Sequence, residues 1–143
     1  MAIEKHGSAH WKGDLKTGVG NVSTETGVLN HQTYGFNTRF EGETGTNPEE
    51  LIGAAHAACF SMALSMVLGE TDLKADAIDT TATVTLDQVD GGFAITKIHL
   101  DVEARIPGAD DAAFQDAATT AKENCPVSKA LAGPDITMEA RLA

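Results

Sequence analysis

Two cysteines, Cys59 and Cys125, are the residues of this sequence whose settings best suit redox chemistry. Cys59 lies in the middle of a segment, 51–69, that carries no charged side chain. Cys125 directly precedes Pro126 at the expected start of a short helix, where free backbone N–H groups stabilise a thiolate. Two cysteines so far apart in the sequence can also be inert, buried thiols. Their spacing alone therefore does not show whether the two cysteines are inert buried thiols or redox-active ones.

Arg39 is the third candidate, because it is the only lysine or arginine between Lys16 and Lys74. Phe36 and Phe40 flank it, which is a partly apolar setting for a guanidinium group. An arginine held in such a place needs an acidic partner. A surface arginine with a solvated head is the plainer alternative.

Glu49 and Glu50 follow Arg39 by about ten residues, and local chemistry does not choose between them. A guanidinium fixed by one of these carboxylates would lower the pKa of the Cys59 thiol. In one continuous helix Glu49 and Cys59 would lie about 15 Å apart, at ~1.5 Å per residue, so the two cannot touch. Either the long Arg39 side chain bridges them, or one of them comes from a second subunit.

His56 precedes Cys59 by one helical turn and could act as a base for its thiol. This arrangement would suit a cysteine hydrolase that uses Cys59 and His56. A histidine in an apolar helix is more often a hydrogen-bonded core residue. A zinc site built from Cys59, Cys125, His56 and a carboxylate lacks the close ligand pairs that zinc sites show. The sequence also has no glycine-rich phosphate loop between a strand and a helix.

The helix expected to carry Cys59 begins with a clear start signal. Asn47 can cap it, Pro48 suits the first helical position, and Glu49 and Glu50 complement the positive end of the helix dipole. All its faces are apolar, which predicts burial on every side. Its many small side chains suit close packing against a partner helix, so we expect a homodimer with sites at the subunit boundary.

Strands are expected on both sides of this helix. Alternating patterns and turn signals predict them at Ser8–Lys12, Gly20–Thr26, Tyr34–Phe40, Ile78–Asp87, Lys97–Ile106 and Asp135–Leu142. Asp90, Gly91 and Gly92 predict a hairpin turn. Asp110 or Asp111 can cap a further helix. The order is therefore β-β-β-α-β-β-α-α-β, and one-sided alternation predicts an α+β fold with antiparallel sheets.

Composition narrows the function classes. The 143 residues predict one domain, 1–143, and the formal charge of −11 disfavours nucleic acid and anionic membrane surfaces as partners. The apolar segment 51–69 is barely long enough to span a membrane and is rich in Ala, Ser and Gly. The N-terminus lacks the apolar core of a signal peptide, so we expect a cytoplasmic protein in a reducing compartment.

Three motifs closely resemble the OsmC (osmotically inducible protein C) family, and the resemblance covers essentially the whole chain. They are YGFNTRF at 34–40, TNPEEL through AACF at 46–60, and NCPVS at 124–128. The match is nearer to the OsmC branch than to the organic hydroperoxide resistance branch. The resemblance implies an intertwined homodimer, in which antiparallel sheets wrap around long central helices and the active sites lie at the dimer interface.

By position, the resemblance assigns Cys59 as the peroxidatic cysteine and Cys125 as the resolving one. It assigns Arg39 to activate the thiolate and Glu49 to orient the arginine. It implies a thiol peroxidase that reduces organic hydroperoxides and is recycled by an external dithiol such as a lipoyl group. No metal, flavin or haem is expected, since the thiols carry the electrons. Besides the hydrolase, the remaining alternative is a non-catalytic dimeric binder of small apolar ligands.

Overall fold

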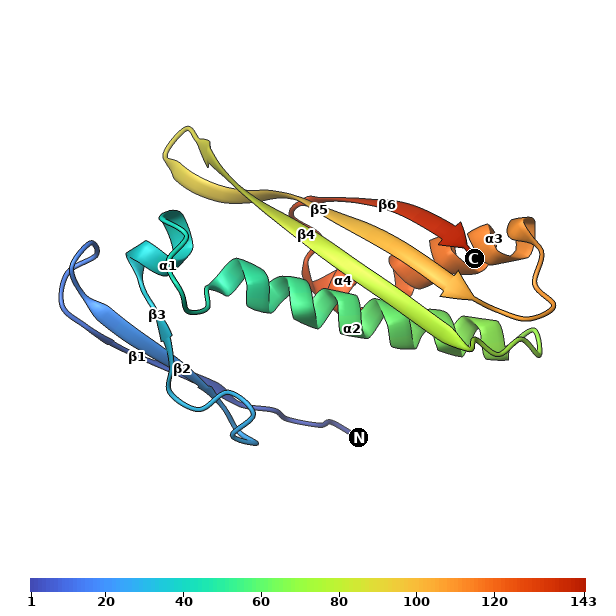
Figure 1. Ribbon diagram of the computed structural model, residues 1–143, viewed down its shortest axis with the longest axis horizontal. Helices are drawn as coiled ribbons and strands as arrows, with labels where there is room; N and C mark the ends of the chain where they lie inside the picture. The colour runs from blue at the N-terminus through green and yellow to red at the C-terminus, as the bar shows by residue number, and fades with distance from the viewer. The chain divides into compact units, whose positions relative to one another are not determined.

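The chain divides into two units in a computed structural model that describes all residues from 1 to 143. The first unit is Met1–Leu51 and the second is Ile52–Ala143. Each unit contains its own three-stranded sheet (Figure 1). The two units are described separately below.

The first unit is an antiparallel sheet followed by a helical turn. Its strands are β1 (Gly7–Lys12), β2 (Val19–Thr24) and β3 (Gln32–Tyr34), hydrogen-bonded in that order. Gly20 of β2 has no side chain because a Cβ there would lie 2.6 Å from the rings of both Trp11 and Tyr34. The hydrophobic core of the protein consists entirely of residues from Ile52 onward. The first unit therefore has no apolar core of its own.

The strand predicted at Tyr34–Phe40 is wrong, because β3 ends at Tyr34 and the helix α1 occupies Phe36–Phe40. Thr38 closes this turn by hydrogen bonds to the backbone of Gly35. Its hydroxyl accepts from the Gly35 N–H (2.8 Å) and lies 3.1 Å from the Gly35 carbonyl, to which it can donate. Such side-chain bonds to the backbone compete with strand pairing and favour the turn.

The long helix α2 (Pro48–Gly69) begins as predicted. The Asn47 side-chain oxygen accepts a hydrogen bond from the Glu50 N–H at 2.8 Å, which satisfies one of the free donors of the first turn. The prediction that α2 is buried on every side is wrong for the single chain. Phe60 is fully buried, whereas Met62 and Met66 are 76% and 64% exposed. One apolar face of α2 is therefore open.

The second unit packs helices against one face of a long sheet (Figure 1). Its remaining elements are β4 (Ala77–Val89), β5 (Gly92–Arg105), α3 (Asp111–Asn124), α4 (Pro126–Ala130) and β6 (Asp135–Leu142). The core between sheet and helices comprises Phe60, Leu64 and Leu68 of α2, Ile98, Leu100, Val102 and Ala104 of β5, and Phe114, Ala118 and Ala121 of α3. This layered arrangement fixes the positions of α2, α3 and α4, which carry the cysteines.

The α+β class is confirmed, and one strand pairing differs from the expected antiparallel pattern. β4 and β5 form the predicted antiparallel hairpin around Asp90 and Gly91, and Gly91 has a φ of 91°. β6 instead pairs parallel with β5. The chain between these two strands forms α3 and α4, and a connection of that length can return a strand in the parallel direction. At the start of α3, Asp110 accepts from the Ala113 N–H at 2.7 Å and is the cap.

Candidate active site

The two cysteines meet in the second unit. Cys59 lies on α2, and Cys125 is the single residue between α3 and α4. Both are free, and their side chains lie close enough for each to shift the pKa of the other. Cys59 is half-buried and Cys125 is fully buried. The structure thus brings together two cysteines that are far apart in the sequence, and only one of them faces solvent.

An apolar groove of about 610 Å³ opens at Cys59. Its other lining residues are Ala55, Ala58, Met62, Ala63, Met66 and Val67 of α2, together with Ala121, Asn124 and Pro126. A ligand with an apolar body could lie in this groove and present a reactive group to the Cys59 sulfur. Cys125 is not part of the lining and is fully buried, so it is closed to solvent.

The two thiols have pKa values shifted in opposite directions. Burial raises the pKa of Cys59, and the hydrogen bond and charge of Cys125 raise it further, although the Val127 N–H offsets part of this effect. Burial also acts to raise the pKa of Cys125, but hydrogen bonds from Cys59, Ser128 and Val127 outweigh it, so the pKa is lowered. No lysine or arginine of the second unit contributes to the shift of Cys59.

His56 is a buried core residue and not a base directed at Cys59. Its Nε2 atom lies 2.7 Å from the Ser128 hydroxyl oxygen, and its side chain has no exposed surface. Burial lowers the pKa of His56, which keeps the ring neutral. The hydrolase alternative required this imidazole to contact the Cys59 thiol. The structure gives His56 a different partner.

Sequence reasoning missed Ser128, which contributes to the lowered pKa of Cys125. A signal was available in the sequence. Cys125 stands at the cap position before Pro126, and the third helical residue after a cap is the one whose N–H points back at it. A serine at that position can add its hydroxyl to the same acceptor.

Arg39 and Glu49 form a two-fold ion pair in the first unit. Arg39 donates from Nε to Glu49 Oε1 at 2.9 Å and from Nη2 to Oε2 at 2.8 Å. The carboxylate side chain is only 12% exposed and the guanidinium side chain 36%. Glu50 has another partner, since its Oε2 atom accepts from the Thr46 hydroxyl at 2.8 Å. Glu49, not Glu50, is therefore the residue that holds the arginine.

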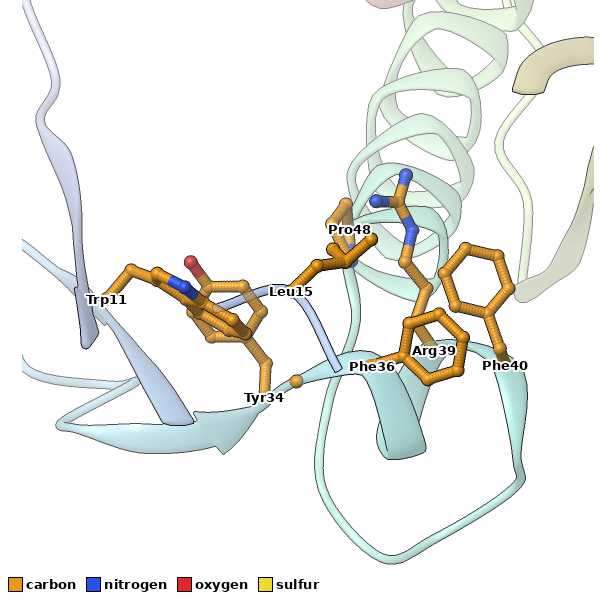
Figure 2. A pocket seen from close by; sticks show the side chains of 8 residues that line it. Trp11, Leu15, Tyr34, Phe36, Arg39, Phe40 and Pro48 are labelled. Carbon is orange, nitrogen blue, oxygen red and sulfur yellow. The ribbon is translucent and has the colours of Figure 1, made fainter. Parts of the chain in front are cut away.

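Arg39 also lines an aromatic pocket of about 220 Å³ (Figure 2). The Phe36 and Phe40 rings pack with centroids 4.8 Å apart, and the guanidinium carbon lies 5.5 Å from the centroid of Phe40. Trp11 and Tyr34 form the opposite wall, with centroids 5.5 Å apart. The ion pair and the rings together restrict the arginine to one orientation beside the start of α2.

The four candidate residues therefore form two pairs, one in each unit. Cys59 contacts Cys125, and Arg39 contacts Glu49. No group of three or more His, Cys, Asp or Glu side chains is arranged to hold a metal ion.

Comparison with known proteins places this chemistry in a family. The family model described as "OsmC-like protein" matches residues 40–139. The chain belongs to the OsmC family. The family assignment made from the three sequence motifs is thus confirmed.

Two relatives show which branch of the OsmC family this chain resembles more in sequence. It is 62% identical over 142 residues to Peroxiredoxin OsmC of Escherichia coli (strain K12), covering 99% of each chain. It is 36% identical over 123 residues to Organic hydroperoxide resistance protein OhrB of Bacillus subtilis (strain 168), covering 85% of this chain and 88% of that protein. The higher identity lies on the OsmC side, as the motifs predicted.

Solved structures show the same fold. A crystal structure of an organic hydroperoxide resistance protein OsmC from Legionella pneumophila covers 100% of this chain and 98% of its own, with a TM-score of 0.74 and 25% identity. An OsmC-like protein from Mycoplasma pneumoniae has a TM-score of 0.73 at 15% identity, which concerns the fold alone.

The family also explains the hydropathy of α2. By length and composition alone this helix could cross a membrane. Its most apolar 18-residue window has a mean hydropathy of 1.8, and 28% of that window is buried in the single chain. In this soluble OsmC-family protein it is the central helix, and its buried residues pack against the sheet. The apolar face that stays open includes the groove at Cys59.

Proposed function

We propose that this protein is a thiol peroxidase that reduces organic hydroperoxides to alcohols. One observation carries the proposal: Cys59 is half-buried, lines an apolar groove and lies beside the fully buried Cys125. A peroxide can reach the first sulfur, and the second is placed to attack it afterwards. The similarity to Peroxiredoxin OsmC supports the same chemistry.

In the first step the Cys59 thiolate attacks the distal oxygen of the hydroperoxide. The O–O bond breaks, the alkoxide takes a proton and leaves as the alcohol, and Cys59 becomes a sulfenic acid. In the second step Cys125 attacks the Cys59 sulfur, which forms the disulfide and releases water. An external dithiol then reduces the disulfide and restores both thiols.

Activation of Cys59 requires a positive charge that its own unit does not supply. Burial raises the pKa of this thiol, and no cation of the second unit opposes the shift. We assign that role to Arg39, which Glu49 holds in a fixed orientation. The same guanidinium can donate a hydrogen bond to the peroxide oxygen. The assignment holds for an Arg39 of the same chain and for one of a partner subunit, because both satisfy the chemistry.

We further propose that the protein works as an intertwined homodimer in which residues 1–143 form one domain. The first unit has no core of its own, and α2 leaves Met62 and Met66 exposed. The first unit and the open face of α2 therefore each need an apolar partner to pack against. A Met66→Lys variant should shift the mass measured by light scattering from dimer to monomer. A Ser65→Lys variant places the same charge on a neighbouring exposed position of α2 and should remain a dimer. A native protein that is monomeric by the same measurement would refute the dimer.

The substrate and reductant follow from the groove and the disulfide. The apolar lining favours a bulky organic hydroperoxide over hydrogen peroxide. The reductant is a dithiol, and a lipoyl group fits by family analogy. We place the protein in the cytosol, where such dithiols are kept reduced.

Peroxide consumption tests the function directly. With cumene hydroperoxide and dihydrolipoamide, the native protein should turn over, Cys59→Ser should be inactive, and Cys125→Ser should stop after one equivalent. Ser65→Ala, a substitution on the same helix, is the matched control and should keep full activity. Full turnover by Cys59→Ser would refute the proposal.

A further inference from the structure

A chain of buried polar groups lies behind the two cysteines, and the proposed reaction does not yet use it. His56 Nε2 lies 2.7 Å from the Ser128 hydroxyl oxygen. Ser128 is the third residue of α4, the short helix that Cys125 caps, and it contributes to the lowered pKa of Cys125. His56 and Cys125 are fully buried, and Ser128 is 5% exposed. The chain connects α2 to α4 and ends at the sulfur beside Cys59.

The direction of these hydrogen bonds follows from the number of protons available. Ser128 has one hydroxyl proton. A hydroxyl that donates this proton to the Cys125 sulfur agrees with the lowered pKa of that thiol. The Ser128 oxygen must then accept from the Nε2–H of His56.

The other ring nitrogen of His56 agrees with this tautomer. Nδ1 is buried and has no hydrogen-bond partner. Burial lowers the pKa of His56, so the ring carries a single proton, and that proton is on Nε2. An acceptor without a partner is also more often tolerated in protein interiors than an N–H without one.

We propose that His56 and Ser128 are positioning residues for the resolving step. The Nε2–H of His56 orients the Ser128 hydroxyl, and the hydroxyl holds the Cys125 sulfur ready to attack oxidised Cys59. The inference rests on the resolving role of Cys125 proposed above. In that step the S–S bond forms and the S–O bond of the sulfenic acid breaks. Cys125 is oxidised, Cys59 is reduced, and the Cys125 proton leaves with the hydroxide as water.

The Ser128 hydroxyl matters because Cys125 is fully buried. Burial alone would raise the pKa of this thiol and slow its ionisation. A hydrogen bond to a charged group is worth about a tenfold change in an equilibrium or more. The loss of this bond should therefore slow disulfide formation while leaving the reaction of Cys59 with peroxide unchanged.

The test separates the two steps in time. The reduced protein is mixed with one equivalent of cumene hydroperoxide and quenched at intervals. Mass spectrometry then measures the sulfenic acid, trapped with dimedone, and the Cys59–Cys125 disulfide. Ser128→Ala should form the disulfide about tenfold more slowly and accumulate the sulfenic acid, with an unchanged rate of peroxide loss. The matched control is Ser61→Ala on α2, because that hydroxyl bonds to the Ala57 carbonyl and to Thr80 and not to either cysteine.

A second pair of variants keeps the test decisive if Ser128→Ala fails to fold. His56→Leu removes the donor to Ser128 and should slow the disulfide step, whereas His56→Gln can still donate an N–H and should restore most of the rate. In a Cys59→Ser background, thiolate absorbance should show a higher pKa for Cys125 after Ser128→Ala. A purely structural role would not produce this rescue or this shift.

Each outcome decides the proposal. Disulfide formation at the native rate in both Ser128→Ala and His56→Leu would overturn it and leave the peroxidase assignment intact. Equal slowing of peroxide loss and disulfide formation would also overturn it, because the effect would not be confined to resolution. If the native protein forms no Cys59–Cys125 disulfide, this inference and the proposed mechanism fail together.

Discussion

Replacement of Glu49 by glutamine tests whether the ion pair of the first unit activates the thiol. Both carboxylate oxygens hold Arg39, at 2.9 and 2.8 Å, and the glutamate side chain is only 12% exposed. Glutamine keeps the shape but has one acceptor oxygen, so its NH₂ group must face an N–H donor of Arg39. At least one charge-assisted bond is lost.

The size of the effect follows from the exposure of the pair. A hydrogen bond to a charged group contributes about 1.5–3 kcal/mol. The Arg39 side chain is 36% exposed, so water replaces part of the lost interaction. We therefore expect Glu49→Gln to lower the free energy of unfolding by about 1–2 kcal/mol, measured by urea denaturation.

The effect on catalysis should be larger than the loss of stability suggests. An arginine that is no longer fixed stabilises the Cys59 thiolate and the peroxide oxygen less well, and we expect kcat/KM to fall about 10- to 100-fold, or about 1.4–2.8 kcal/mol. Stopped-flow measurement of Cys59 oxidation gives the rate of this step. Its pH profile should move to higher pH, because a weaker cation leaves the pKa of Cys59 higher.

Glu50→Gln is the matched control for this prediction. It removes the same charge from the next residue of α2, whose carboxylate contacts Thr46 and not Arg39. Its rate of Cys59 oxidation should equal that of the native protein. If Glu49→Gln and Glu50→Gln oxidise at the same rate, or if Glu49→Gln changes only the urea midpoint, the arginine does not act through Glu49.

Three further substitutions test the fold and the buried histidine. Burial lowers the pKa of His56, so below pH ~6.5 the unfolded state takes up a proton on this ring that the folded state does not, and stability falls as the pH is lowered. His56→Gln should reduce this loss of stability. Urea midpoints at about pH 7.5 and about pH 5 measure it. Gly20→Ala should displace the aromatic wall of the pocket, and because Trp11 is the only tryptophan, its fluorescence should report the change. Phe114→Ala should lower the free energy of unfolding by about 3–5 kcal/mol in urea titration, since the ring is fully buried in the core. Unchanged pH dependence, emission spectrum or urea midpoint would contradict the respective prediction.

Local signals predicted most of the fold because they act within a few residues. Asn47 caps α2 through the N–H of Glu50, and Asp110 caps α3 through that of Ala113, as side-chain chemistry requires. The element at Phe36–Phe40 was missed because the Thr38 hydroxyl closes a turn that apolar alternation does not reveal. The parallel pairing of β6 with β5 depends on a partner far away in the sequence, so no local pattern could show it.

The site was predictable only in part. Helical spacing could not place Cys59 beside Cys125, and the family resemblance supplied that pairing. The choice of Glu49 over Glu50 depends on where each side chain leaves the first turn of α2: Glu50 is used by Thr46, which frees Glu49 for Arg39. The directions of these side chains depend on the folded structure, and composition and spacing do not reveal them.

Burial raises the pKa of Cys59, and the second unit supplies no cation to oppose it, so the cation of the proposed mechanism has to come from elsewhere. Within the second unit the hydrogen bonds converge on Cys125, so a negative charge is better accommodated there than on Cys59. A peroxidase needs the charge on the sulfur that the groove exposes, which is Cys59. A cation placed at Cys59 stabilises the negative charge on that sulfur, so Cys59 and not Cys125 is the thiolate in the first step. Once the peroxide has oxidised Cys59, the interactions of Cys125 with Ser128 and Val127 remain and favour the Cys125 thiolate, which is the nucleophile of the second step. The surroundings that disfavour a thiolate at Cys59 are therefore the ones that favour a thiolate at Cys125.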